Sequence, residues 1–385
     1  MKIRTNKLLN TIHPSMIREM KGLADLYEDV IDFTLGEPHL FHETYQLIHE
    51  DLHKRLLKDS LGYANFLGMP KLKEMLLTYC KQRFNQTYEE DEIVITNGVS
   101  EGISAVLKMI LEQGDEVIIF NPAFVLYQSN IQMNGGVVVE YDLLSTHMKV
   151  DKEKLMSLMT DKTKAIILNS PCNPTGKMMS DEDLACIYDC IKDKPIFIIS
   201  DEIYRELIFD YQNYPSISQY LDLRSRLFIL NGLSKSFAMT GWRVGYVLGP
   251  RDYMKIIGVV HQNMVSCIST ISQYAAIEAL QHPEIVEKIR RYYRKNRDYA
   301  YEALSPYFKN IIKPEGAFYL YIDISNFQKT SYDFSMKLLK DAKVAIVPGI
   351  AFEKHDSGYV RMSYCCDYEV LREGVRRIQT YINLC

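Results

Sequence analysis

The sequence predicts an α/β protein with a mostly parallel sheet between helices in a larger domain, together with a smaller α+β domain. The first observation is that short apolar runs alternate with amphipathic helical patterns through the middle of the chain, as in layered α/β domains. The second is that runs such as EVIIF at 116–120 are apolar at successive positions. That pattern is typical of strands covered on both faces, as in a parallel sheet.

The predicted elements of the larger domain follow one another closely. A strand at 92–96 leads into a helix at 100–111, in which Ile103, Val106 and Ile110 share one side. Helices lie between most of the later strands, which we expect at 116–120, 165–168, 196–200, 227–230 and 244–248.

The pattern changes after about residue 280. A long charged helix is predicted over 283–304, and two later helices over 332–340 and 368–382. Strands are predicted at 317–322, 344–347 and 359–364. We therefore place the large domain at 46–282 and assign 1–45 and 283–385 to the small domain.

The composition indicates an ordinary globular protein without a nucleic-acid or membrane partner. The 385 residues exceed what one core usually holds, so at least two domains are expected. The hydrophobic fraction is 47%, the charged fraction 24% and the net charge only -4, with both signs interspersed. No apolar run is typical of a signal peptide or a membrane span. We expect a cytoplasmic protein with eight reduced cysteines.

One short motif points to a different chemistry. Residues 49–53 (HEDLH) match H-E-x-x-H, in which His49 and His53 would bind zinc from one face of a helix and Glu50 would act as a base. The surrounding stretch is densely charged, and no later segment supplies a convincing third ligand. We favour a solvated helix face and keep a zinc hydrolase as a remote alternative.

Two polar segments follow predicted strands. Residues 96–102 (TNGVSEG) place Gly98 and Ser100 at the start of a helix, where free N–H groups and the helix dipole favour an anion. Taken alone, a plain N-cap explains that segment better. Residues 169–176 (NSPCNPTG) form a loop at the end of a strand, on the edge where α/β sheets bind ligands. A surface turn is the alternative.

Two further segments carry ionisable groups. Asp201 follows a buried strand, where a carboxylate needs a partner unless the loop is exposed. Lys235 follows another buried strand within 231–246 (NGLSKSFAMTGWRVGY), and Arg243 lies eight residues further on. A desolvated lysine near a second cation becomes a nucleophilic amine, and arginine offers paired donors to phosphate. The length of this segment argues against an exposed loop.

In order and spacing, these segments resemble the class I/II, fold-type I aminotransferases that depend on pyridoxal 5'-phosphate (PLP), and within them the Iγ branch. The resemblance spans nearly the whole chain and implies the PLP-dependent transferase fold with a seven-stranded type of sheet. The matching segments are 14–18 (PSMIR), 35–38 (LGEP), 62–68 (GYANFLG), 173–176 (NPTG), 201–204 (DEIY), 234–243 (SKSFAMTGWR) and 359–361 (YVR).

The resemblance implies roles around the PLP ring. Lys235 is expected to hold the cofactor as a Schiff base and then to move the substrate's Cα proton. Asp201 is expected to pair with the ring nitrogen, and Tyr204 and Asn173 to bind the ring oxygen. Phe124 is expected to stack on the ring face.

The resemblance also implies how phosphate and substrate are held. Arg361 is expected to clamp the α-carboxylate of the substrate, with Asn173 and the Gly36 N–H beside it. Tyr63 is expected to reach the phosphate of a neighbouring subunit, which implies a homodimer with shared active sites. The phosphate itself is expected to rest on Val99, Ser100, Ser234 and Arg243.

The function implied is transfer of an amino group from an L-amino acid to a 2-oxo acid, with 2-oxoglutarate as the expected acceptor. Aromatic amino acids, aspartate and N-acetyl-diaminopimelate all remain possible donors. A PLP-dependent C–S lyase, or a related non-transaminating enzyme of the same fold, is the alternative, because the same lysine, aspartate and arginine serve both chemistries.

Overall fold

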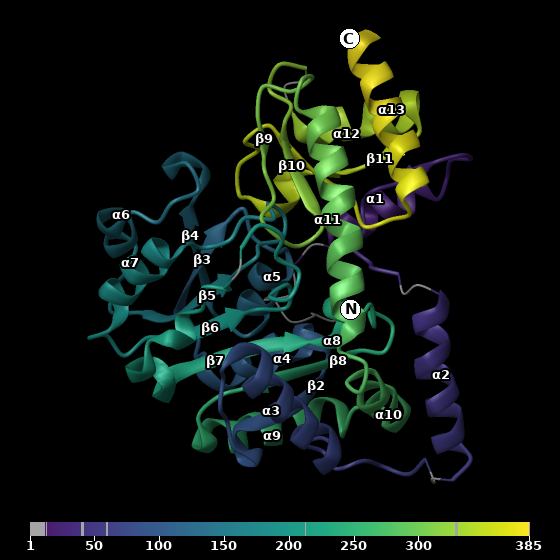
Figure 1. The fold of residues 1–385 in the computed structure, drawn as a ribbon. Coiled ribbons are helices and arrows are strands. Elements are labelled where there is room, and N and C mark those ends of the chain that lie inside the picture. The colour runs from purple at the N-terminus through teal and green to yellow at the C-terminus, as the bar shows by residue number, and fades with distance from the viewer. Residues whose placement is uncertain are drawn as a thin grey trace, which may run out of the picture.

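The computed structural model describes residues 12, 14–39, 42–58, 61–211, 213–327 and 330–384. Its largest feature is a seven-stranded sheet in the order β2-β8-β7-β6-β5-β3-β4, shown in Figure 1. All neighbouring strands run parallel except β8, which is antiparallel to both β2 and β7. The mostly parallel sheet predicted from the sequence is therefore confirmed. Its strands are β2 (Ile93–Asn97), β3 (Glu116–Asn121), β4 (Val137–Asp142), β5 (Thr163–Asn169), β6 (Phe197–Asp201), β7 (Leu227–Gly232) and β8 (Val244–Leu248).

Both faces of this sheet are buried, which explains the continuous apolar runs. Along β3, Val117 and Ile119 belong to one buried cluster and Ile118 and Phe120 to another, because successive side chains point to opposite faces. The edge strand β4 was not expected from the sequence, and most of its side chains are only partly buried. The covering helices are α3 (Pro70–Phe84), α4 (Gly98–Ile110), α5 (Leu126–Met133), α6 (Lys152–Ser157), α7 (Asp181–Ile191), α8 (Leu233–Ser236), α9 (Arg251–Val265) and α10 (Thr270–Ala279).

A second, antiparallel sheet lies in the C-terminal part of the chain, with the order β12-β13-β10-β9. The long helix α11 packs against α13 beside it (Figure 1). The elements are α11 (Glu284–Leu304), β9 (Ile311–Ile312), β10 (Tyr319–Asp323), α12 (Ser331–Lys337), β12 (Val347–Pro348), β13 (Tyr359–Ser363) and α13 (Tyr368–Leu384).

Two sequence-based expectations for this region need correction. The strand expected at 344–347 is two short strands, β11 (Val344–Ala345) and β12, which belong to different sheets. β11 pairs in parallel with β1 (Ile31–Asp32), a partner more than 300 residues away along the chain, so no local pattern could reveal the break. The helix expected at 332–340 ends at Lys337 and continues as a π-helical turn, Leu338–Ala342.

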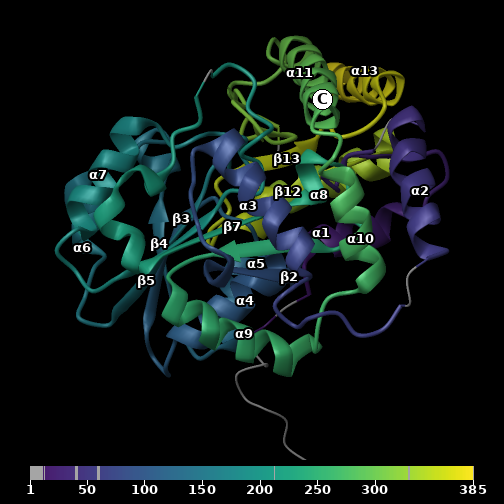
Figure 2. The same ribbon diagram turned by 60° about the horizontal axis from the view of Figure 1, so that its bottom comes forward.

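The N-terminal part of the chain contacts both halves of the molecule. Helix α1 (Met16–Ala24) packs on β11 and β12, whereas α2 (His42–Leu56) packs against α10, and Figure 2 shows α2 beside α10 from a second side. The predicted boundary after residue 45 falls inside α2, and the division into domains stays a prediction. Short 3-10 turns complete the fold at Glu90–Glu92, Leu144–Thr146, Ile217–Gln219, Leu221–Arg226 and Gly349–Phe352.

The carboxyl ends of three central strands bring polar residues together. β5 ends at Asn169 and β6 at Asp201, and these two residues are register partners. β7 ends at Gly232, which pairs with Gly245 at the start of β8. This is the sheet edge at which α/β proteins bind ligands. None of the helices in the described ranges combines the length and the hydropathy needed to cross a membrane.

Candidate active site

A cavity of about 590 Å³ opens at this edge of the seven-stranded sheet. It lies between the ends of β5, β6 and β7 and residues of α1 and β13. Eleven of the twelve site residues predicted from the sequence line it: Gly36, Val99, Ser100, Phe124, Asn173, Asp201, Tyr204, Ser234, Lys235, Arg243 and Arg361.

Lys235 lies on α8, directly after β7, and its side chain is partly buried at the wall of the cavity. Its Nζ donates a hydrogen bond to the carbonyl oxygen of Gly36 at 2.7 Å. Burial, with smaller contributions from Arg243 and Arg361, lowers the pKa of Lys235 to about 8, while Cys365 and Glu37 oppose the shift. About a tenth of this amine is therefore neutral and nucleophilic at pH 7, far more than for an ordinary lysine.

Asp201 is buried at the end of β6 and is held by two donors. The Tyr127 hydroxyl donates to Oδ2 at 2.6 Å, and the backbone N–H of Ile203 donates to Oδ1 at 3.1 Å. Burial raises the pKa of Asp201 to about 6, and both hydrogen bonds oppose the rise. A carboxylate fixed in this way is suited to pair with a cationic ring nitrogen.

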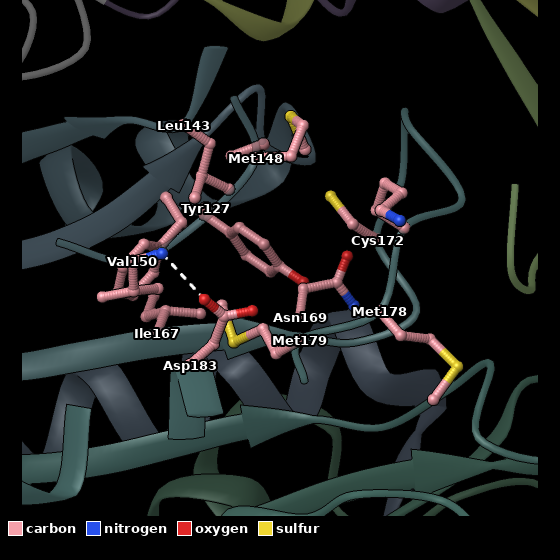
Figure 3. A pocket seen from close by; sticks show the side chains of 13 residues that line it. Tyr127, Leu143, Met148, Val150, Ile167, Asn169, Cys172, Met178, Met179 and Asp183 are labelled. Atoms are coloured by element: carbon pink, nitrogen blue, oxygen red, sulfur yellow. Dashed lines mark hydrogen bonds between the residues drawn. The ribbon is translucent and has the colours of Figure 1, made fainter. Parts of the chain in front are cut away.

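Tyr127 is a site residue whose contact with Asp201 could not be predicted from the sequence. Its ring borders a second, enclosed cavity of about 30 Å³, which Figure 3 shows from close by. Most of the side chains around this cavity are apolar or contain sulfur. At the edge of the cavity, the backbone N–H of Val150 donates a hydrogen bond of 2.8 Å to Asp183 Oδ1. These side chains thus surround the Tyr127 ring on the side away from Asp201, and the Tyr127 hydroxyl faces Asp201. The cavity is lined in part by Leu143, Met148, Ile167, Cys172, Met178 and Met179.

Arg361 lies on the opposite side of the cavity and is 1% exposed. It donates to Asn173 Oδ1 at 2.8 Å and to the carbonyl oxygen of Thr34, and its guanidinium lies 4.5 Å from the centroid of the Tyr319 ring. Burial lowers the pKa of Arg361. Within the described residues its Nε has no hydrogen-bond partner, and no carboxylate lies within ion-pair distance. A buried cation in this state can accept a carboxylate ligand.

Tyr204 and Asn173 approach the same space from the large sheet. The Tyr204 hydroxyl is 2.8 Å from that of Tyr319. The Asn173 backbone is held by Asn169 Oδ1, which accepts its N–H at 3.0 Å. Phe124 also lines the cavity, and its ring meets Tyr127 edge-on with 5.7 Å between centroids.

The start of α4 forms a cradle for an anion. Gly98 has a φ of +72°, and a Cβ there would lie 2.3 Å from Arg243 Nη2. A Cβ on Gly245 would lie 2.5 Å from the carbonyl carbon of Gly98. Because these glycines lack side chains, Arg243 can approach the free N–H groups at the start of α4. Val99 and Ser100, in the first turn of this helix, line the cavity. Such a helix start is suited to bind phosphate.

Two predicted features lie elsewhere. Tyr63 is 95% exposed and does not line the cavity of its own chain. His49 and His53 lie on α2, as expected, but the His49 ring is not on a solvated face: it packs against Tyr45 and Trp242. Across the ranges that the structure describes, no group of three or more His, Cys, Asp or Glu side chains is placed to hold a metal ion. The geometry gives the zinc-hydrolase alternative no support.

Comparison with known proteins agrees with this geometry. The family model described as "Aminotransferase class I and II" matches residues 28–378. A probable N-acetyl-LL-diaminopimelate aminotransferase from Bacillus subtilis is 39% identical over 98% of this chain and 95% of its own length. An aspartate aminotransferase from Pyrococcus abyssi is 35% identical over 96% of each chain.

Solved structures agree equally well. The aspartate aminotransferase of Thermotoga maritima superposes with a TM-score of 0.91 and 32% identity, covering 98% of this chain and 100% of that one. An aromatic aminotransferase from Pyrococcus horikoshii gives a TM-score of 0.86 and 33% identity, covering 95% and 99%. This chain therefore belongs to the class I and II aminotransferases and is a fold-type I, PLP-dependent enzyme.

Proposed function

We propose that this enzyme transfers the amino group of an L-amino acid to a 2-oxo acid, with 2-oxoglutarate as acceptor and PLP held by Lys235 as a Schiff base. The observation that carries the proposal is the partly buried Lys235 amine, whose pKa is lowered to about 8, in one cavity with buried Asp201 and Arg361. When bound, PLP supplies an electron sink for the substrate's Cα electrons.

The chain's own residues fit this cofactor. Asp201 would pair with the ring nitrogen, and Tyr127 would keep the carboxylate ionised and correctly turned. Phe124 would cover the ring, and Tyr204 and Asn173 would bind its oxygen. The phosphate would rest on the start of α4, with Val99, Ser100, Ser234 and Arg243 around it.

The opposite side of the cavity fits the substrate. Arg361 would bind the α-carboxylate through paired donors, which the guanidinium geometry favours. Asn173 Oδ1 already accepts a hydrogen bond from Arg361 Nη1 and would fix the orientation of the guanidinium. The N–H of Gly36 would reach the same carboxylate from a segment packed tightly on Tyr319, where a Cβ on Gly36 would lie 2.0 Å from the phenol oxygen. Lys235, released from the cofactor by the substrate, would then move the Cα proton.

A homodimer with shared sites belongs to the same proposal. Tyr63 is 95% exposed and would reach the phosphate bound by the neighbouring subunit. Exposed apolar side chains elsewhere on the surface support a covered face; they include Leu61, Ile256, Val259 and Met264. We also place the enzyme in the cytoplasm, because the seven described cysteines are all free.

The donor class follows from the relatives only as a proposal. Relatives named for aspartate, aspartate/prephenate and N-acetyl-LL-diaminopimelate, and a neighbouring structure named as an aromatic aminotransferase, define the candidate donors. The test is a donor panel with 2-oxoglutarate and the PLP-loaded protein, in which glutamate and the new 2-oxo acid are both measured.

We expect the two products in equal amounts with at least one donor, and none with Lys235→Ala. Ammonia and pyruvate formed from a sulfur-containing donor, without any glutamate, would identify a lyase and contradict the proposal. The absence of glutamate with every donor would contradict it as well.

A further inference from the structure

The cavity contains more positive charge than the proposed function uses. Four cations line it: Arg18, Lys235, Arg243 and Arg361. In the proposed function, Lys235 holds the cofactor, Arg243 its phosphate and Arg361 the α-carboxylate of the substrate. Arg18 is left over among the cations in the described part of the lining.

Arg18 has no partner that accounts for its place at the cavity. Its side chain is exposed, and among the described residues no hydrogen bond or ion pair is formed by its guanidinium. The acidic groups that line the cavity are otherwise engaged: Glu37 accepts the Thr240 hydroxyl at 2.7 Å, and Asp201 is held by Tyr127. A free guanidinium at the wall of a ligand cavity is suited to bind an anion.

The fold holds Arg18 in a fixed relation to Arg361. Arg18 follows Ile17, which is buried in one cluster with Tyr321 and Val347. Those two residues are the register partners of Arg361 on the strands at either side of β13. Helix α1 therefore packs on the strands that flank β13, and Arg18 and Arg361 line the same cavity.

Two cations held in this way suit a ligand with two carboxylates. We propose that Arg18 binds the distal carboxylate of dicarboxylic substrates while Arg361 holds their α-carboxylate, which makes Arg18 the residue that selects dicarboxylic over monocarboxylic 2-oxo acids. This assignment rests on the proposed function for the roles of the other three cations. Because Arg18 is exposed, its contribution is that of a solvated ion pair and smaller than that of buried Arg361.

The test compares ligands of equal chain length that differ only in the distal carboxylate. The PLP-loaded enzyme is titrated with glutarate and with pentanoate, and binding is followed by the visible absorbance of the cofactor. We expect Arg18→Gln to weaken glutarate binding by about fivefold and to leave pentanoate binding within about twofold. Arg18→Lys should recover part of the loss, because lysine keeps the positive charge but lacks the paired N–H donors of the guanidinium.

The same comparison is made in turnover, with one donor and with 2-oxoglutarate or 2-oxopentanoate as acceptor. Arg18→Gln should lower kcat/KM for 2-oxoglutarate by about fivefold and spare 2-oxopentanoate. Lys21→Gln is the matched control, since Lys21 lies on the same helix but pairs with Asp25 and does not line the cavity. It should change neither value.

Equal losses for both members of either ligand pair, or no loss for either, would overturn the role of Arg18. Wild-type enzyme that transaminates no acceptor at all would contradict the proposed function instead. In that case the glutarate and pentanoate titrations still decide whether Arg18 binds the distal carboxylate.

Discussion

The two sides of the cavity differ in how their charges are satisfied. On the side of the large sheet, Asp201 receives two hydrogen bonds and Lys235 donates to a carbonyl oxygen. On the opposite side, the Nε of Arg361 has no partner in the described chain and the guanidinium of Arg18 has none. Asp201 and Lys235 on the sheet side thus have partners in the folded chain, whereas the two arginines on the opposite side keep donors free for a ligand. This difference suits a permanent cofactor on one side and an exchanging substrate on the other.

The largest effect is expected on the sheet side. Lys235→Ala removes the amine that we propose both holds the cofactor and moves the proton, so turnover should fall by about 10³-fold or more. The phosphate contacts should still retain some cofactor. Borohydride reduction followed by mass spectrometry should label Lys235 in the wild type and leave the variant unlabelled. Covalent labelling of another lysine in the wild type would contradict the assignment.

The next effect is expected on the substrate side. Arg361→Ala should lower kcat/KM for amino acids by an amount that corresponds to about 2–5 kcal/mol of transition-state stabilisation, because the α-carboxylate would lose the buried partner that we propose for it. PLP affinity, measured by equilibrium dialysis, should stay close to that of the wild type. A comparable loss of PLP affinity would show that the two sides are not independent and would break the comparison.

A smaller effect is expected at Tyr127, where a substitution can remove the hydroxyl and keep the packing of the ring. Tyr127→Phe keeps the ring but removes one hydrogen bond to a charged group, worth about 1.5–3 kcal/mol. The pKa of Asp201 should rise above about 6, since the ionised form loses a donor, and the acid limb of the activity profile should move to higher pH. Tyr141→Phe, which removes a buried hydroxyl that accepts from Asp151 N–H outside the cavity, is the control. An unmoved acid limb in Tyr127→Phe would contradict the role.

The smallest effect is the pH dependence of cofactor capture by the wild-type apoenzyme. The pKa of Lys235 is about 8, and only the neutral amine attacks an aldehyde. The capture rate should therefore rise about 10-fold per pH unit below pH 8 and level off above it. Stopped-flow absorbance measures this rate. A midpoint near 10.5, the ordinary value for lysine, would show that burial does not activate the amine.

Local sequence pattern predicted most of the large sheet, and the family resemblance indicated eleven residues that line the cavity. Six of its seven strands were predicted within a few residues, because buried parallel strands have continuous apolar runs. Polar residues directly after those runs, such as Asp201 and Lys235, had to meet at one edge of the sheet. The edge strand β4 was missed because most of its side chains are only partly covered.

By itself, then, the sequence determined six of the seven strands of the sheet and the polar groups at its carboxyl edge, since both follow from residue order and side-chain periodicity. The tertiary structure alone decided the rest. It divided 344–347 between two sheets, packed α2 on α10, turned Tyr127 toward Asp201 and placed Arg18 in the cavity of Arg361. These features depend on contacts between residues far apart in the chain, and such contacts leave no periodic signal in either segment.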